Sequence, residues 1–381
     1  LELGLELFQL PYVVVTGSNG KTTTVTLLHE LLRAAGFDSR LCGNVGVPVV
    51  ADLTKEHVFS EPPREKRVLV VEASSYQLET CCTIKPKVAV LLNLSDNHLE
   101  RHGTLQRYFE AKARVFANQD GSDFAVLNAD DAMVFSLAGR LAAKVAAFGK
   151  TFVPGSPQFG AAILGSGTIA LKVAGQDETY DVSSSRLLGA HNRANMAAAL
   201  LAARLMGAQS SALQRAVVEF QPLEHRLEFV EMYGRPLYIN DSKSTTVAAS
   251  VAALTSVVER FPQRSISLLL GGLAKAGSWE PLMNLMQEKQ AHLKRIICFG
   301  KDGNLLASHC RRHALPHVQA KTLQEAVSLV AAQTTVQDIV LLSPGCASFD
   351  QFSDFEERGN VFKSLVRSLH AEAAGGAPVQ E

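Results

Sequence analysis

The stretch from Tyr12 to Thr24, YVVVTGSNGKTTT, constrains the fold more than any other part of the chain. Its apolar start predicts a buried strand, and the glycine turn that follows leads into a helix beginning near Lys21. Gly17 and Gly20 allow a tight turn whose backbone N–H groups can approach a ligand, and a helix N-terminus adds unpaired donors and partial positive charge. The stretch therefore predicts a phosphate-binding loop.

The match to the general pattern G-x-x-x-x-G-K-[ST] is incomplete, because Val15 stands where the pattern has its first glycine. The alternative is an ordinary strand-to-helix turn that happens to contain glycine and lysine. The order of strand, turn, Gly-Lys-Thr and helix favours the phosphate-binding loop, with the lysine on terminal phosphates and the Thr22 hydroxyl on Mg²⁺. The predicted phosphate-binding residues of the loop are Gly17, Ser18, Asn19, Gly20, Lys21, Thr22 and Thr23.

Composition narrows the class of protein. The 381 residues suffice for two or three domains, and 37 Lys and Arg balance 37 Asp and Glu. No charge excess therefore indicates nucleic acid or a membrane surface as a partner. The six cysteines lack metal-binding or disulfide-dense spacing, which suits a reducing compartment. No apolar run approaches the ~20 residues of a membrane helix, and no signal peptide is found, so we expect a cytoplasmic protein.

Two further apolar strands end in polar residues. Residues 67–75, RVLVVEASS, contain Glu72, and residues 87–94, KVAVLLNL, lead to His98. Ligands bind at the carboxyl ends of strands in α/β sheets, and Mg²⁺ favours carboxylates and phosphates, so Glu72 is a candidate ligand. The alternatives are a solvated glutamate and a surface histidine. Lys112, in an alanine-rich helical stretch, suggests by itself only a solvated side chain.

Alternating strands and helices predict a mostly parallel, doubly wound sheet in the first part of the chain. Residues 161–182 break this rhythm with short alternating runs and glycine turns, which predict hairpins at the sheet edge. A long helix then starts near Asn192, for which a helix cap is the alternative interpretation. Asn195 lies three residues further on and therefore on the same helix face.

The order of elements restarts after Gln221-Pro222, which predicts a second, Rossmann-like α/β domain. We therefore expect an α/β protein with domains at residues 1–222 and 223–370. Residues 371–381, AEAAGGAPVQE, are expected to form a disordered tail.

A series of motifs occurs in one order along nearly the whole chain: TGSNGKTTT (16–24), GNVGVP (43–48), EASSYQLE (72–79), NLSDNHLERHGT (93–104), AKAR (111–114), GAHNRAN (189–195), EHRLE (224–228), NDSKSTT (240–246), GGLAKAG (271–277) and LLSPGCASFDQF with FEERG (341–359). With them the chain resembles the Mur ligase family, ATP-dependent amide-forming ligases of peptidoglycan precursor synthesis. SSYQLE and SPGCASFDQF favour the glutamate-adding branch over its siblings and over folylpolyglutamate synthetases. The resemblance implies a central, P-loop ATPase-like, ATP-binding domain followed by a glutamate-binding domain.

The resemblance also implies a mechanism. ATP phosphorylates a substrate carboxylate, and an amine attacks the acyl phosphate to give an amide, ADP and phosphate, which is chemistry that needs cations and Mg²⁺ but no protein nucleophile. The implied catalytic residues are Lys21, His98 and Lys112, the last matching a lysine that is carbamylated in the family. The implied Mg²⁺ ligands are Thr22, Glu72, His98 and carbamylated Lys112.

Matching positions supply the remaining roles. The implied nucleotide contacts are Asn192, Asn195, Arg226, Asp241 on the ribose, and Lys243. The implied substrate contacts are Asn44 and the glutamate pocket of Thr245, Lys275, Ser348, Phe349 and Phe355. The implied partners are small molecules, UDP-N-acetylmuramoyl-L-alanine and glutamate, acted on by a monomer.

The chain departs from the family at its start. Family members carry a further domain of about a hundred residues that binds the uridine diphosphate, within the usual domain size. Here Leu1 is not a methionine, and only about ten residues precede the first strand. We expect either a fragment or a chain that receives this function elsewhere, and that binds ATP well but the UDP-sugar poorly.

Three hypotheses remain open. The first is a ligase that adds glutamate to UDP-N-acetylmuramoyl-L-alanine, with L-glutamate possible in place of D-glutamate. The second keeps the chemistry but changes the acceptor, as in another Mur step or a folylpolyglutamate-type ligase. The third is a non-catalytic nucleotide-binding remnant.

Overall fold

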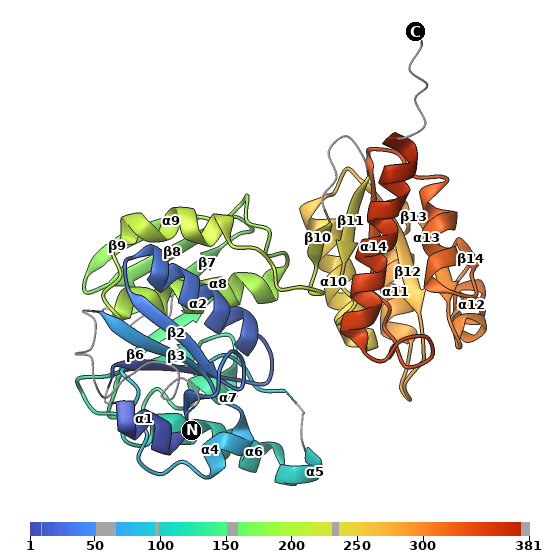
Figure 1. Ribbon diagram of the computed structural model, residues 1–381. Helices are drawn as coiled ribbons and strands as arrows, with labels where there is room; N and C mark the ends of the chain where they lie inside the picture. Colours follow the sequence, from blue (N-terminus) through green and yellow to red (C-terminus); the bar gives the residue numbers. More distant parts are fainter. Residues whose placement is uncertain (9, 51–65, 96–98, 151–158, 231–235, 375–381) are drawn as a thin grey trace. The chain divides into compact units, whose positions relative to one another are not determined.

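The computed structural model describes residues 1–8, 10–50, 66–95, 99–150, 159–230 and 236–374. Internal contacts divide the chain into two compact units, coloured blue to green and yellow to red in Figure 1. The first consists of Leu1–Arg186 and Ala190–Phe220, and the second of Leu187–Gly189 and Gln221–Glu381. The main division thus falls two residues before the boundary expected from the sequence.

The first unit is built on one mixed sheet. Its strands lie in the order β2-β3-β1-β4-β5-β6-β7-β8-β9, parallel from β2 to β7 and antiparallel at the β7-β8-β9 edge. The predicted parallel sheet and edge hairpins are therefore confirmed. The elements are α1 (Glu2–Phe8), β1 (Tyr12–Thr16), α2 (Lys21–Ala34), β2 (Asp38–Gly43), β3 (Arg67–Glu72), α4 (Ser75–Glu79), β4 (Val88–Leu91), α5 (Leu99–His102), α6 (Leu105–Ala113), η1 (Arg114–Phe116), β5 (Phe124–Asn128), α7 (Ala132–Phe135), β6 (Lys144–Gly149), β7 (Phe159–Leu164), β8 (Thr168–Val173), β9 (Gln176–Asp181), α8 (Ala190–Leu205) and α9 (Ser210–Glu219).

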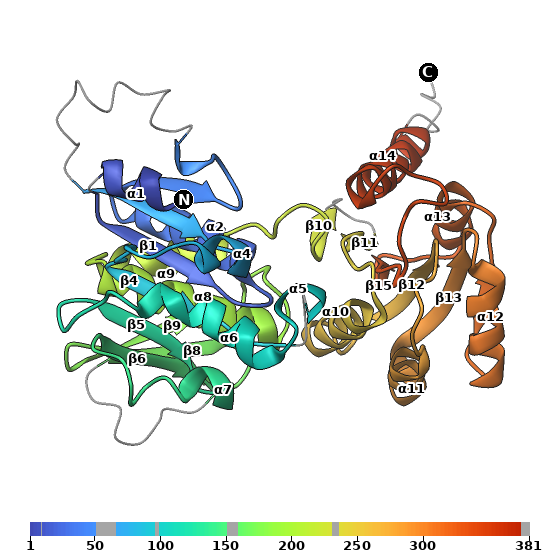
Figure 2. The same ribbon diagram turned by 90° about the horizontal axis from the view of Figure 1, so that it is seen from below.

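Helices cover both faces of this sheet. Helices α2, α8 and α9 pack together on one face, and α1, α4, α6 and α7 lie on the other (Figures 1 and 2). Val14, Leu69 and Leu91 of the three central strands join the core under the second group of helices. Strands buried on both faces explain the unbroken apolar runs of the sequence. The carboxyl ends of β1, β3 and β4 consequently meet at one edge, where the site is built.

The second unit has its own sheet, ordered β10-β11-β15-β12-β13-β14, in which only the pairing of β10 with β11 is antiparallel. Leu268 and Leu270 of β12 enter the core on one face, and Leu269 enters the core on the other. Its elements are β10 (Glu228–Val230), β11 (Leu237–Asn240), α10 (Val247–Arg260), β12 (Ser265–Gly271), α11 (Glu280–Glu288), η2 (Gln290–His292), β13 (Leu293–Phe299), α12 (Gly303–Arg312), β14 (His317–Gln319), α13 (Leu323–Ala331), β15 (Asp338–Leu342) and α14 (Phe355–Ala374).

Helix α14 corrects one expectation. It continues to Ala374, so the predicted disordered tail, 371–381, is wrong for its first four residues. The reason is local, because the sequence Ala-Glu-Ala-Ala has high helix propensity and simply extends the helix. The rest of the tail lies outside the described residues. Among the residues that are described, no helix is long and apolar enough to cross a membrane.

Candidate active site

The phosphate-binding loop joins β1 to α2 as the sequence predicts. Gly17 and Gly20 both have positive φ, 153° and 84°, a backbone region that non-glycine residues rarely adopt. Gly20 is the residue that precedes the first turn of α2. A Cβ added to Gly20 would lie 2.4 Å from Oδ1 of Asn195 on α8. The backbone conformation therefore favours glycine at position 20, and a side chain there would also have to displace the Asn195 amide.

Residues that follow β4 hold the loop in shape. The backbone N–H of Ser18 donates to the carbonyl of Asn93 (2.9 Å), and that of Asn19 donates to Asn93 Oδ1 (2.8 Å). Asn93 Nδ2 donates back to the Asn19 carbonyl (3.1 Å). Asn93 belongs to the motif NLSDNH, whose pattern alone does not predict this role. The segment that follows β4 thus holds the loop in this conformation.

Two lysines converge on one carbonyl of the loop. Lys21 Nζ donates to the carbonyls of Gly17 (2.8 Å) and Ser18 (3.0 Å), and Lys112 Nζ donates to the same Gly17 carbonyl (2.9 Å). Lys112 is only 1% exposed, so a solvated side chain, the alternative interpretation, is wrong. Burial, followed by the positive charge of Lys21, lowers the pKa of Lys112 to about 7. Its amine lies 4.5 Å from the centre of the Tyr108 ring.

Glu72 lies at the end of β3, paired in register with Val15 of β1. It is 2% exposed, which rules out the solvated glutamate considered from the sequence. Asn44 Nδ2 donates to its Oε1 (2.9 Å), while Oε2 is buried with no hydrogen-bond partner. Asn44, expected to contact substrate, therefore holds the Glu72 carboxylate. His98, the other expected ligand, lies outside the described residues.

A buried carboxylate oxygen without a partner suits a cation, because leaving it unpaired is costly. The donor set near Glu72 is incomplete as a metal cage: the described residues contain no cluster of three or more His, Cys, Asp or Glu side chains that could hold a metal. Mg²⁺ commonly binds one or two carboxylates and completes its shell with waters and substrate phosphates. The residues present therefore fit Mg²⁺ bound together with a nucleotide.

Two asparagines near the start of α8 lie close to the phosphate-binding loop. Asn195 Nδ2 donates to Asn192 Oδ1 (3.1 Å), which confirms that they share one helix face. Asn192 lies in the third position of α8, so the helix-cap alternative is wrong. Because Asn195 also approaches Gly20, α8 reaches the loop through these amides.

Asp241, at the end of β11, is buried in the second unit. It accepts hydrogen bonds from the Leu227 N–H (3.1 Å), from the Ser343 hydroxyl (2.9 Å) and from the Ser244 hydroxyl. Burial raises the pKa of its carboxyl to about 6 in spite of these donors. Asp241 therefore organises the loops around it, in addition to the ribose contact that the family resemblance implies.

The other predicted nucleotide contacts in this unit differ in exposure. Arg226 is exposed on the turn before β10, and Lys243 is half-buried with its amine 3.5 Å from the centre of the Phe355 ring. Burial, followed by the charge of Arg226, lowers the pKa of Lys243. The structure thus brings together Lys243 and Phe355, which the resemblance had assigned to different ligands.

Two loops carry the predicted glutamate pocket. Leu273 and Ala347 exchange backbone hydrogen bonds (2.9 Å each), which places the loop of Lys275 beside the loop of Ser348. Ser348 is 1% exposed, and its Oγ has no hydrogen-bond partner. Lys275 and Phe349 are exposed. The remaining predicted member, Thr245, lies partly exposed just before α10.

Arg358 is a buried charged residue near the predicted glutamate pocket that was not predicted from the sequence. It is 0% exposed and donates to Ser242 Oγ (2.9 Å), the Ser242 carbonyl (2.8 Å) and the Cys346 carbonyl (3.0 Å). Burial lowers its pKa to about 10, so it stays charged at neutral pH. It ties the loop of Lys243 to the loop that leads to Ser348. Its presence in the motif FEERG was the available signal.

A phosphate-binding loop at the carboxyl edge of a parallel sheet, with a buried carboxylate and two lysines beside it, defines a nucleotide-dependent α/β enzyme. Comparison with known proteins makes the class specific. Residues 15–203 match the Mur ligase middle domain, and residues 225–346 match the Mur ligase glutamate ligase domain. The chain belongs to the Mur ligase family.

Relatives are similar over almost the whole chain. The chain is 38% identical over 378 residues to the UDP-N-acetylmuramoylalanine–D-glutamate ligase of Geotalea uraniireducens (strain Rf4), covering 97% of this chain and 77% of the relative. It is 39% identical over 371 residues to the enzyme of the same name from Pelotomaculum thermopropionicum, with the same coverage.

Solved structures share the fold. The MurF ligase from Thermotoga maritima in complex with ADP superposes with a TM-score of 0.66 at 20% identity, covering 96% of this chain and 82% of that one. A UDP-N-acetylmuramoyl-L-alanyl-D-glutamate–2,6-diaminopimelate ligase gives a TM-score of 0.66 at 22% identity, covering 95% of this chain and 79% of that one.

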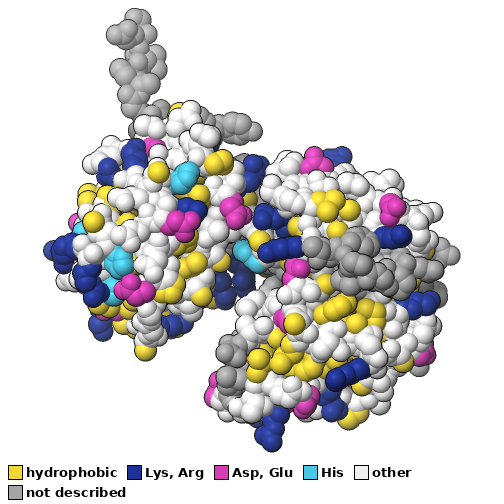
Figure 3. Space-filling model, turned by 180° about the vertical axis from the view of Figure 1, so that it is seen from behind, with side chains coloured by type: hydrophobic (Ala, Val, Ile, Leu, Met, Phe, Trp, Pro, Cys, Tyr) yellow, Lys and Arg dark blue, Asp and Glu magenta, His cyan; other side chains and the backbone are white. Residues whose placement is uncertain are grey.

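On the face shown in Figure 3, acidic and basic side chains are interspersed, in keeping with the balanced composition.

Proposed function

We propose that this chain is an ATP-dependent ligase that joins D-glutamate to the alanine carboxylate of UDP-N-acetylmuramoyl-L-alanine, a step of peptidoglycan precursor synthesis. Its family and the names of relatives at 38% and 39% identity support the reaction. The observation that carries the proposal is the convergence of Lys21 and Lys112 on the Gly17 carbonyl, beside the unpartnered oxygen of Glu72. This is an arrangement for transferring a phosphoryl group.

In the first step a carboxylate oxygen attacks the γ-phosphorus of ATP, and the bond to ADP breaks. Lys21 exchanges its two loop carbonyls for phosphate oxygens and stabilises the charge that develops on them. In the second step the neutral glutamate amine attacks the acyl carbon, the bond to phosphate breaks, and the proton of the nitrogen passes to the released phosphate or to water. Positioning of the reactants supplies most of the catalysis, because no protein nucleophile takes part.

Mg²⁺ fits this site and, when bound, neutralises charge on the phosphates. The residues that would hold it are Glu72 through its carboxylate, Thr22 through its hydroxyl, His98 and carbamylated Lys112. Carbamylation requires a neutral amine, and burial lowers the pKa of Lys112 enough to supply one at neutral pH. The modification turns this lysine from a cation into a carboxylate-like ligand.

Further residues hold the two organic substrates. The nucleotide contacts are Asn192, Asn195, Arg226, Asp241 and Lys243, and the substrate contacts are Asn44, Thr245, Lys275, Ser348, Phe349 and Phe355. The buried, unpartnered Ser348 hydroxyl is suited to a carboxylate of the incoming glutamate. The protein acts as a cytoplasmic monomer on small molecules.

An ADP-release assay with Mg-ATP, UDP-N-acetylmuramoyl-L-alanine and a panel of amino acids tests the proposal. D-Glutamate should produce the largest rate, and Lys21→Ala should abolish it while leaving the thermal midpoint unchanged. A rate with L-glutamate alone would reassign the stereochemistry, and a rate only with another acceptor, such as a folate, would reassign the substrate. ATP binding without ADP release in any combination would identify a non-catalytic remnant.

A further inference from the structure

The turn that carries Arg226 has an unusual backbone. His225 and Leu227, on either side of it, both have positive φ, 63° and 47°, although neither is glycine. Non-glycine residues keep this conformation only where their surroundings enforce it, and such positions concentrate at functional sites. Arg226 itself is exposed between its two buried neighbours.

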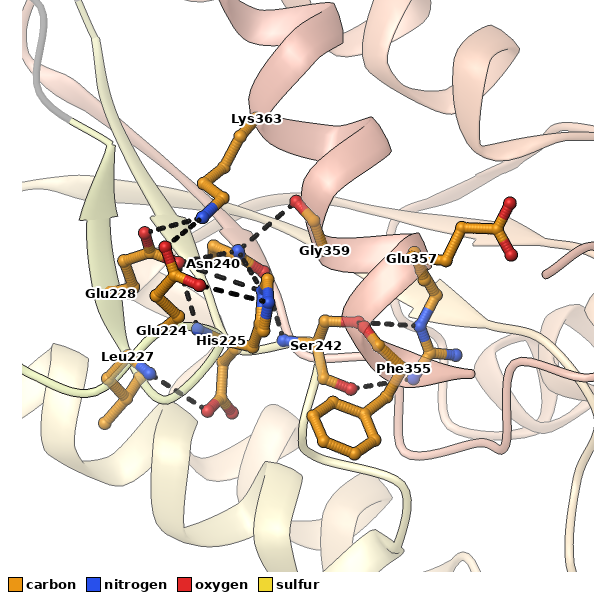
Figure 4. Close-up of polar contacts among 12 residues, drawn as sticks. Glu224, His225, Leu227, Glu228, Asn240, Ser242, Phe355, Glu357, Gly359 and Lys363 are labelled. Atoms are coloured by element: carbon orange, nitrogen blue, oxygen red, sulfur yellow. Dashed lines mark hydrogen bonds and ion pairs between the residues drawn. The ribbon is translucent and has the colours of Figure 1, made fainter. Parts of the chain in front are cut away.

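Glu228 is the centre of the network that holds the turn on one side (Figure 4). Its Oε2 accepts from the His225 N–H (2.9 Å) and from Asn240 Nδ2 (2.9 Å). Its Oε1 accepts from Lys363 Nζ on α14 (3.1 Å). Lys363 is only 7% exposed and also reaches Glu224 (3.2 Å). One carboxylate thus links the residue before Arg226 to β11 and to α14.

The strand end of β11 holds the other side of the turn. The backbone N–H of Lys243 donates to the His225 carbonyl (3.0 Å), and the Leu227 N–H donates to Asp241 (3.1 Å). Both neighbours of Arg226 are therefore fixed through their backbone. With the backbone held on both sides, the direction in which the Arg226 side chain leaves the turn is fixed, and only its own rotamers can vary.

Helix α14 closes the network against the His225 ring. A Cβ on Gly359 would lie 2.1 Å from His225 Nδ1, so only glycine lets the helix approach. Asn240 Nδ2 donates to the same nitrogen (3.0 Å), and burial, followed by the charge of Lys363, lowers the pKa of His225. A neutral ring that accepts at Nδ1 fits both observations.

We propose that Glu228, supported by Lys363, is a positioning residue that directs the Arg226 guanidinium at the bound nucleotide. This rests on the proposed function, which supplies the nucleotide. Fixing the backbone of the turn before binding removes the backbone part of the ordering cost of placing the arginine, so affinity depends on a carboxylate that never touches the ligand. None of the residues in this network besides Arg226, Asp241 and Lys243 needs to contact the nucleotide.

A double-mutant cycle tests this inference, with Mg-ADP affinity measured by calorimetry on the whole chain. Glu228→Gln keeps the shape but places an amide among the donors of Asn240 and Lys363. It should weaken binding about tenfold, within the range of coupling between residues joined through one hydrogen-bond network and a shared backbone. In an Arg226→Ala background the same substitution should have no further effect. Lys363→Met should show the same coupling with a smaller loss, and Glu288→Gln, an exposed glutamate paired with Lys289, is the charge-matched control.

The possible results separate cleanly. Full loss of the Glu228→Gln effect in the Arg226→Ala background supports the positioning role. Additive losses, or unchanged affinity in both Glu228→Gln and Lys363→Met, overturn it. Thermal unfolding of each variant shows whether it is still folded. If Glu228→Gln is not folded, the Lys363→Met variant tests the positioning role in its place. Failure of the wild type to bind Mg-ADP would instead contradict the proposed function itself.

Discussion

Lys112 gives the most quantitative prediction, because the structure lowers its pKa from 10.5 to about 7. The difference of about 3.5 units corresponds to about 5 kcal/mol between its two charge states. A pKa near 7 leaves a substantial share of the buried amine neutral at pH 7.4, whereas an ordinary exposed lysine is almost wholly charged there. Only the neutral amine can react with carbon dioxide, so the structure predicts carbamylation at this lysine and at neutral pH.

Nuclear magnetic resonance of protein with ¹³C-labelled lysine measures this directly. In carbon-dioxide-free buffer one lysine resonance should titrate near pH 7 and should be missing in Lys112→Arg. Added ¹³C-bicarbonate should produce a carbamate signal above pH 7 that disappears on acidification. The reasoning is refuted if every lysine titrates above pH 9.5, or if the low-pH titration persists in the arginine variant.

The same shift predicts how stability depends on pH. The folded pKa is lower than the unfolded one, so between pH 7 and 10.5 the unfolded chain binds more protons and the free energy of unfolding rises with pH. Below pH 7 the full cost of burying the cation applies. From pH 7 to 9 the wild type should therefore gain roughly 2 kcal/mol relative to Lys112→Met in carbon-dioxide-free urea unfolding. A pH-independent difference would contradict the shift.

Three substitutions test other parts of the site. Gly20→Ala places a methyl group against Asn195 and should weaken Mg-ATP binding more than about tenfold by calorimetry, whereas Gly121→Ala, with open space, should not. Glu72→Gln should raise the Mg²⁺ concentration for half-maximal ADP release, because the substitution removes the negative charge of the carboxylate. An unchanged Mg²⁺ concentration would show that Glu72 is not a Mg²⁺ ligand. Asp241→Asn replaces an accepting oxygen with an amide NH2 that faces other donors, and it should lower the free energy of unfolding by about 2 kcal/mol. An unchanged thermal midpoint would contradict this.

Local sequence predicted the elements whose signals are local. The phosphate loop followed from glycine and lysine between an apolar strand and a helix, and Glu72 followed from a carboxylate ending a buried strand. By contrast, β2 was not predicted, because its sequence DSRLCG mixes polar and apolar residues as an edge strand with partial exposure does. The three-residue β14 was missed because so short a strand has no period.

Burial of charged side chains could not be predicted, because it depends on contacts between distant segments. Lys112 is buried through the Gly17 carbonyl, 95 positions away, and Lys363 through Glu228, 135 positions away. Arg358 is buried against Ser242, at a separation of 116. In its own helix, each of these charged residues looks like an ordinary solvent-exposed side chain. Only the packing of the helix against the ends of strands buries it.

Transfer of oxygen isotope from substrate to phosphate tests the central claim most directly. UDP-N-acetylmuramoyl-L-alanine with both oxygens of its alanine carboxylate labelled with ¹⁸O is converted with unlabelled Mg-ATP and D-glutamate, and the released phosphate is analysed by mass spectrometry. An acyl-phosphate route leaves one label in the amide carbonyl and transfers the other to phosphate. Phosphate that carries one ¹⁸O per amide formed is the predicted result, and amide formation with unlabelled phosphate would contradict the account.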